Sequence, residues 1–140
     1  LSIAETGHLV LATLHTSDAI QTVNRVIDVF SDYKQQQIRT TLSFVLNAVL
    51  SQRLIPGIDG GRYMASEIMI ATSGVRSIIR KEKMHQVYSL IQTGRSLGMQ
   101  TMNQSLAELY LSGKISIEQA MMYSSDVQEL KDLTSKGAKP

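Results

Sequence analysis

The chain has 140 residues, of which 43% are hydrophobic and 19% are charged, a composition typical of one or two compact units with a buried core. Its formal net charge of +2 reflects a small excess of Lys and Arg rather than a basic stripe, so nucleic acid is not indicated as a partner. The lack of cysteine excludes disulfides and thiolate-bound zinc, and no apolar run approaches membrane-spanning length.

The first expected elements are the end of a helix at residues 2–5 and a buried strand. Gly7 breaks the helix, and residues 9–14 form a short apolar run without clean alternation, as in a strand covered on both faces in a parallel sheet. His8 and His15 lie at the two ends of this run. Because strand side chains alternate, the spacing places these two histidines on opposite faces.

Two helices are expected after this strand. The first begins after the N-cap candidates Thr16-Ser17-Asp18, with apolar residues at helical spacing up to Phe30. The second is longer and runs from about Lys34 to Gln52, with its apolar residues on one face.

The end of the expected strand is the first candidate for chemistry. Ligands of open α/β sheets sit beyond the carboxyl ends of the strands, and a helix N-terminus attracts anions. His15 and Thr16 occupy this position, so His15 could donate a hydrogen bond to a terminal phosphate. Position alone favours a structural role for both His8 and His15.

A hairpin and a helical region complete the chain. The turn signal Pro56–Gly61 predicts a hairpin between residues 53–55 and 62–70. From residue 72, short helical segments alternate with Gly and Ser, and both Ser116 and Ser125 start a capping-box pattern. We therefore expect three parts, which are a half-sheet unit at 1–71, a helical unit at 72–134 and a flexible tail at 135–140.

Residues 74–82 predict a short amphipathic helix. Val75, Ile78 and Ile79 share one side, whereas Arg76 and Arg80 are four residues apart and form a ridge on another. These arginines are either solvated on an ordinary surface helix or part of a docking or lever surface for a partner.

Other kinds of site are not indicated. The three histidines are far apart in the sequence without an i, i+4 pair, so no metal ligands are expected from these side chains. Neither a G-x-S-x-G elbow nor a G-x-x-x-x-G-K-[ST] phosphate loop is present. If the protein uses a nucleotide, the main grip on its phosphates lies outside these residues.

Several motifs together resemble a known family. Glu5-Thr6-Gly7-His8-Leu9-Val10 followed by Thr13-Leu14-His15-Thr16 resembles the histidine box of the secretion ATPase superfamily, and residues 74–82 resemble the A-I-R-N-L-I-R-E motif of its type IV pilus retraction branch. Further segments match that branch in order and spacing, namely 38–43, 67–70, 85–86, 91–94, 98–102 and 113–116.

The resemblance implies an α/β fold, the latter part of a RecA-like P-loop ATPase domain at residues 1–71, followed by a small helical C-terminal unit. It implies a hexameric ring that hydrolyses ATP with Mg²⁺ and drives pilus retraction and twitching motility. Such a motor is cytoplasmic, lies at the inner membrane and contacts the platform of the pilus machine. The phosphate loop and the Walker B carboxylate would lie upstream, so these residues alone are not expected to hydrolyse ATP.

The resemblance also implies roles for individual residues. His15 and His8 would sense the nucleotide, Thr16 would help to bind it, and Glu5 and Thr6 would serve the subunit interface or coupling. The retraction motif comprises Gly74, Val75, Arg76, Ser77, Ile78, Ile79, Arg80, Lys81 and Glu82. It departs from the family pattern where Gly74 replaces Ala, which weakens the first helical turn, and where Lys81 replaces Glu, which reverses one charge.

Two alternatives stay open. A pilus-assembly or type II secretion ATPase of the same superfamily usually carries a four-cysteine zinc element in this half, and this sequence has no cysteine. A non-catalytic ring adaptor would be recognised only from residues upstream of this chain.

Overall fold

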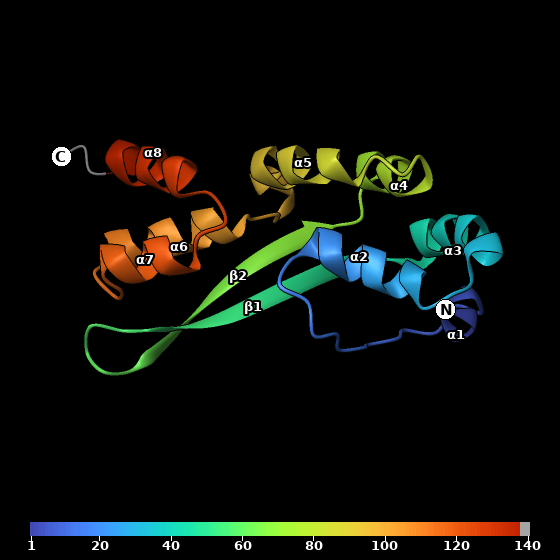
Figure 1. Ribbon diagram of the computed structural model, residues 1–140, viewed down its shortest axis with the longest axis horizontal. Helices are drawn as coiled ribbons and strands as arrows, with labels where there is room; N and C mark the ends of the chain where they lie inside the picture. The colour runs from blue at the N-terminus through green and yellow to red at the C-terminus, as the bar shows by residue number, and fades with distance from the viewer. Residues whose placement is uncertain (138–140) are drawn as a thin grey trace. The chain divides into compact units, whose positions relative to one another are not determined.

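The computed structural model describes residues 1–137, which form short helices and one antiparallel hairpin (Figure 1). The elements in chain order are α1 (Ser2–Glu5), α2 (Ala19–Asp28), α3 (Asp32–Val45), β1 (Ala48–Pro56), β2 (Arg62–Ile70), α4 (Ser73–Arg80), η1 (Met84–Gln86), α5 (Val87–Thr93), η2 (Arg95–Leu97), α6 (Met102–Leu111), α7 (Ile117–Tyr123) and α8 (Val127–Gly137), where η marks a 3₁₀ turn. No helix in this described part of the chain is both long and apolar enough to cross a membrane.

The contacts divide the chain into two compact units. The first contains residues 1–51 and 68–99, and the second contains residues 52–67 and the described residues from Gln100 onward. This division differs from the boundary expected at residue 71 because the hairpin contributes to both cores. Val49 and Met69 lie in the core of the first unit, whereas Ile55 lies in that of the second.

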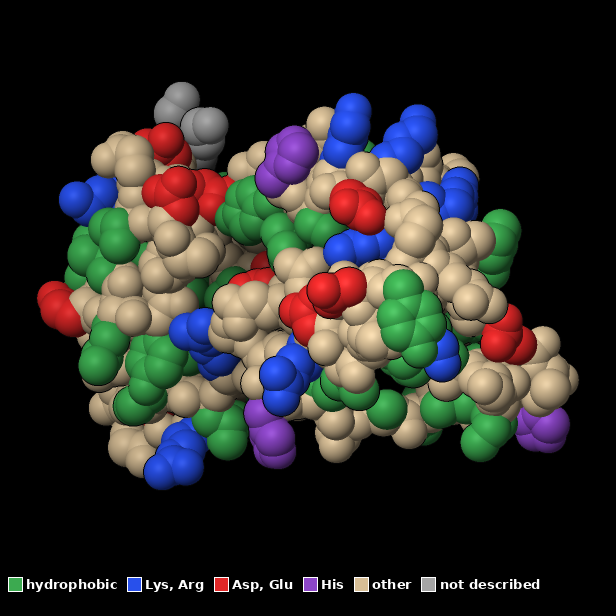
Figure 2. All heavy atoms as spheres, turned by 45° about the vertical axis from the view of Figure 1, so that its right-hand side comes forward, with side chains coloured by type: hydrophobic (Ala, Val, Ile, Leu, Met, Phe, Trp, Pro, Cys, Tyr) green, Lys and Arg blue, Asp and Glu red, His purple; other side chains and the backbone are tan. Residues whose placement is uncertain are grey.

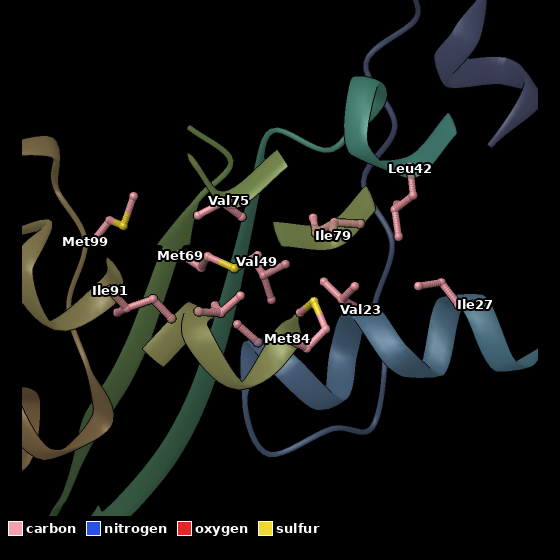
Figure 3. Close-up of a cluster of buried hydrophobic side chains, with 12 residues drawn as sticks. Val23, Ile27, Leu42, Val49, Met69, Val75, Ile79, Met84, Ile91 and Met99 are labelled. Atoms are coloured by element: carbon pink, nitrogen blue, oxygen red, sulfur yellow. The ribbon is translucent and has the colours of Figure 1, made fainter. Parts of the chain in front are cut away.

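The core of the first unit is apolar and shared by helices and hairpin (Figure 3). Val23 and Ile27 of α2 and Val75 and Ile79 of α4 lie in this cluster with Met69 of β2. All five side chains are at most 1% exposed, so each contributes roughly 1.5–3 kcal/mol of apolar burial. This burial fixes α4 within the first unit.

The prediction of a buried strand at residues 9–14 is wrong. Residues 8–16 form no helix or strand, and Leu9 and Leu11 are 79% and 88% exposed. A strand needs a neighbour to pair its backbone groups, and among residues 1–137 the sheet consists of β1 and β2 alone. The expected parallel sheet is therefore replaced, in the described residues, by an antiparallel hairpin.

The second helix ends earlier than the sequence suggested. α3 stops at Val45, and β1 starts at Ala48. Val49 and Ser51 are buried while Leu50 is 60% exposed, which is the alternation of a strand. The apolar pair Val49 and Leu50 also fits helical spacing. Because of this ambiguity, the periodicity predicted a helix that continued beyond Val45.

Other expectations about local structure are confirmed. α2 starts after Asp18, whose carboxylate accepts the backbone N–H of Gln21 at 2.8 Å. The hairpin forms around the predicted turn, and Gly60 there has a φ of +82°, a conformation suited to glycine. Asp59 accepts a 2.6 Å hydrogen bond from the hydroxyl of Tyr63, which lowers the pKa of Asp59 and raises the pKa of Tyr63.

Helix caps organise the second unit. Ser116 caps α7 as predicted, whereas α8 follows Asp126, not Ser125, and this carboxylate accepts the N–H groups of Gln128 and Glu129 at 2.9 and 3.0 Å. A full capping box occurs instead at Thr101 before α6, with Gln104 as its second member.

A buried amide connects α6 to α8. Asn103 is fully buried and donates to the carbonyl oxygen of Asp126 at 2.8 Å and to Glu129 at 2.6 Å, and its own oxygen accepts from Ser124. α8 extends to Gly137, so residues 135–137 are helical rather than part of the expected tail. Residues 138–140, which complete that expected tail, lie outside the described residues.

Candidate functional site

The two box histidines do not come together in a pocket. His8 and His15 are both exposed, at the ends of an extended segment that we call the histidine segment, residues 8–16. On the face drawn in Figure 2 the histidine side chains lie apart from one another. Their imidazoles are therefore available to a ligand or a neighbouring chain, and they form no catalytic pair with each other.

The hydrogen bonds of Thr6 define the tautomer of neutral His8. The Oγ1 atom of Thr6 lies 2.7 Å from the carbonyl oxygen of Ile3 and 2.8 Å from Nδ1 of His8. A hydroxyl has one hydrogen, and a carbonyl can only accept, so Thr6 donates to Ile3. Nδ1 of His8 must then carry its hydrogen and donate to Thr6. This leaves Nε2 of His8 free to accept a hydrogen bond or a proton.

Assigning the hydroxyl hydrogens in the same way gives the direction of the hydrogen bond at Thr16. The hydroxyl of Thr22 donates to the carbonyl oxygen of Asp18 at 2.8 Å, so the hydroxyl of Thr16, 2.7 Å from that of Thr22, must donate to it. Thr16 can accept a further hydrogen bond, but it can donate one to a phosphate only by giving up Thr22.

The start of α2 is not an open anion site. The carboxylate of Asp18 occupies it, accepting from the N–H of Gln21 and, at 3.2 Å, from the hydroxyl of Ser17. A carboxylate at this position satisfies the helix dipole and repels a second anion. The interpretation that the helix N-terminus faces a phosphate therefore finds no support in this geometry.

Glu5 connects the region before the histidine segment to α3. Its Oε1 atom accepts a 3.3 Å hydrogen bond from the hydroxyl of Thr41, which lies on α3. Glu5 is exposed, so this contact is a weak one. It nevertheless places Glu5 and Thr6 next to the helix that also contacts the retraction motif.

The motif helix α4 buries the face that the sequence predicted. Val75 and Ile79 are fully buried, and Ile78 packs at the edge of the same cluster. Thr72 caps the helix by accepting the N–H of Val75 at 3.4 Å. The structure thus confirms an amphipathic helix.

The arginine ridge of α4 is not simply solvated. Arg76 donates from Nε to the carbonyl oxygen of Ala71 at 2.8 Å and from Nη1 to that of Ser43 at 2.6 Å. Nη1 also donates to the carbonyl oxygen of Phe44. Ser43 and Phe44 lie in the last turn of α3, so Arg76 joins α4 to the end of that helix.

Three further contacts complete what we call the α3–α4 junction, formed by Arg39, Ser43, Phe44, Arg76, Arg80 and Glu82. Arg80 donates to the hydroxyl of Ser43 at 3.1 Å, and its guanidinium lies 5.5 Å from the centre of the Phe44 ring. Glu82, at a φ of +58°, forms an ion pair with Arg39, with 3.2 Å between Oε1 and Nε.

Sequence reasoning missed the α3 side of this junction. Arg39 and Ser43 lie in a stretch that matched the family, but nothing in their spacing indicated a contact with residues more than 30 positions away. Lys81, by contrast, is exposed, so the reversed charge lies at the surface.

The described chain shows no cluster of metal ligands, and it has an open depression in its second unit. Within residues 1–137, no group of three or more His, Cys, Asp or Glu side chains is placed to hold a metal ion. An open depression in the second unit contains none of the predicted site residues. Its lining consists of Tyr110, Leu111, Gly113, Ile117, Met121, Lys131, Thr134 and Ser135.

Comparisons with known proteins show which proteins this chain resembles. Residues 1–60 match the sequence model of the family described as type II/IV secretion system protein. The chain is 52% identical over 120 residues to the type IV pilus retraction ATPase PilT of Pseudomonas aeruginosa, an alignment covering 86% of this chain and 35% of the relative. It is 49% identical over 121 residues to a twitching motility protein of Neisseria gonorrhoeae, covering 86% and 32%.

A solved structure shows the same fold. The crystal structure of the pilus retraction motor PilT with bound ADP matches with a TM-score of 0.79 and 47% identity, over 89% of this chain and 35% of that one. The chain is therefore similar to the type II/IV secretion system protein family, whose model matches residues 1–60. It is PilT-like, that is, similar to the pilus retraction ATPases, and it spans about a third of the length of the relatives it matches.

Proposed function

We propose that this chain is the latter part of a RecA-like motor that forms a hexameric ring and retracts type IV pili by hydrolysing ATP. The observation that carries this proposal is the similarity to PilT, at 52% identity over 86% of the chain. The relative whose structure contains ADP supports a nucleotide as the ligand. Residues 1–71 would complete the ATPase core, and residues 72–134 would form the helical C-terminal unit.

The chemistry of hydrolysis would be divided between this chain and residues outside it. The sequence has no phosphate loop, so ATP and Mg²⁺ would be held mainly by those other residues. His15 and His8 would sense the γ-phosphate at a subunit interface, with Thr16 accepting a hydrogen bond nearby. The Nε2 atom of His8 supports this role because Thr6 does not occupy it and, once protonated, it can donate a hydrogen bond to a phosphate oxygen.

Coupling would run through the first unit. Glu5 and Thr6 precede the histidine segment, and Glu5 contacts Thr41 of α3. α3 in turn contacts α4 through the α3–α4 junction. A shift of the histidine segment on nucleotide hydrolysis would thus reach the retraction motif, and the motif would move the ring against the platform of the pilus machine at the inner membrane.

Retraction is favoured over secretion or assembly by the similarities. Identity is 52% to PilT but 26% to the type II secretion system protein HxcR of Pseudomonas aeruginosa.

The test is ATP turnover by the longest native chain containing these residues, under ring-forming conditions. We expect robust turnover in the parent and at least a tenfold loss in His15→Ala, with nucleotide still bound. His85→Ala, a change of an exposed histidine outside the box, serves as the matched control and should keep the parental rate. Absence of turnover in the parent would favour the non-catalytic adaptor, and equal rates in parent and His15→Ala would make His15 structural.

A further inference from the structure

The starting point is the way in which α3 ends. The last carbonyl groups of a helix lack partners within the helix, and many helices satisfy them with a glycine in the left-handed conformation. α3 has no such glycine, since its C-cap is Leu46 at a φ of −67° and a ψ of 129°. The N–H of Leu46 satisfies only the carbonyl oxygen of Leu42, at 2.9 Å.

Arg76 fills this gap from another helix. Its guanidinium donates to the carbonyl oxygens of Ser43 and Phe44 in the last turn of α3, and to that of Ala71 just after β2. Arg76 is half-buried, so these bonds are partly shielded from water. A single side chain thereby holds the end of α3, the end of β2 and α4 together.

The chemistry of the group explains why an arginine stands here. A positive charge is favourable at the negative end of a helix dipole. The planar guanidinium also presents Nε and Nη1 in different, fixed directions, whereas the ammonium of a lysine is a single point. Lysine would keep the charge, but it could not reach Ala71 and the end of α3 at once.

We propose that Arg76 is a positioning residue whose guanidinium holds α3, β2 and α4 together as one rigid body, an arrangement that we call the clamp. Arg76 would contribute to the motor through these internal hydrogen bonds rather than through a charge offered to a partner. The hydrogen bonds of Arg76 go to backbone oxygens within this chain, so the role that we propose is positional and not one of nucleotide binding. The link to pilus movement rests on the proposed function, whereas the clamp itself does not.

The test compares two arginines of the same helix in the full-length protein. Arg76→Lys removes the guanidinium and its differently directed N–H groups, whereas Arg80→Lys keeps a donor and a cation near Ser43 and the Phe44 ring. Arg62→Lys, at an exposed residue of the hairpin, is the surface control. We expect hydrogen exchange of the Leu46 amide to become at least tenfold faster in Arg76→Lys and to change less than threefold in the other two.

The activity readout separates positioning from binding. In Arg76→Lys we expect the KM for ATP to stay within twofold of the parent, while twitching is lost; the surface control Arg62→Lys should retain twitching. Unchanged exchange at Leu46, or full twitching in Arg76→Lys, would overturn the clamp because charge alone would then suffice. A tenfold rise in KM would overturn it as well, since Arg76 would then act at the nucleotide.

A second measurement covers the case in which Arg76→Lys does not fold. If α3 and α4 form one rigid body in the unmodified protein, hydrogen exchange of the Leu46 and Ile79 amides should show similar protection. Clearly different protection of these two amides would contradict the proposal. If the parent shows no ATP turnover, the proposed function fails, while the exchange data still decide on the clamp.

Discussion

The histidine segment and the α3–α4 junction both carry family motifs, yet they are held in opposite ways. The histidine segment is exposed and is anchored through its ends, by Thr6 at His8 and by Thr22 at Thr16. The junction is held by hydrogen bonds to backbone oxygens, an ion pair and a buried apolar face. The comparison teaches that one motif keeps its reactive groups available, whereas the other uses its charged groups to fix the position of a helix.

The largest expected difference between the two regions concerns apolar side chains. Ile79→Ala in α4 should lower the free energy of unfolding by about 3 kcal/mol because the side chain is fully buried and would leave a cavity. Leu11→Ala in the histidine segment, where the leucine is 88% exposed, should change it by less than about 0.5 kcal/mol. Urea unfolding of both variants checks this, and similar losses would show that the segment is packed in solution.

A smaller effect, of opposite sign, is expected at the start of α4. Gly74→Ala should stabilise the protein by about 0.5 kcal/mol, since alanine restricts the unfolded chain and favours the helix. A Cβ atom there would lie 3.3 Å from Cδ1 of Leu90, a half-buried side chain that can move slightly.

The measurement for this change is the midpoint of thermal unfolding, which should rise. The matched control is Gly94→Ala, where a Cβ atom would lie 2.8 Å from the backbone oxygen of Leu90, so the midpoint should fall. A lower midpoint in Gly74→Ala would mean that Leu90 is held as firmly as the junction.

The smallest expected effect is that of Thr6→Val, a variant that tests the tautomer of His8. It should change the free energy of unfolding by less than about 0.5 kcal/mol. Long-range ¹H–¹⁵N spectra of histidine-labelled protein at neutral pH should show the hydrogen of neutral His8 on Nδ1. Thr6→Val removes its acceptor, so this preference should disappear while the signals of His15 and His85 stay unchanged. A hydrogen on Nε2 in the parent would contradict the hydrogen-bond network at Thr6.

The sequence predicts the elements whose signals are local. Asp18 as a cap, the turn at Pro56–Gly61 and the buried face of α4 follow from composition and spacing over a few residues. Prediction fails where a distant contact decides. Val49 fits a helix or a strand equally well, and only pairing with β2 makes it part of a strand. The apolar run at residues 9–14 indicates a strand, but no strand pairs with it among residues 1–137.

The candidate site divides along the same line. The motifs point to His8, His15 and the ridge of Arg76 and Arg80 by resemblance and spacing. They do not reveal that Arg76 contacts Ser43, because a guanidinium can reach carbonyl oxygens of any neighbouring helix and leaves no pattern in the partner sequence. Backbone acceptors are invisible in a sequence for this reason.

The end of α3 also has a consequence for the order of folding. The oxygen of Ser43 is satisfied by a residue 33 positions later, so the last turn of α3 is complete only after the hairpin has formed and α4 has docked. Local contacts form early, whereas contacts that close long loops form late. The first turns of α3 can therefore nucleate alone, but its final turn belongs to the last stage at which the first unit assembles.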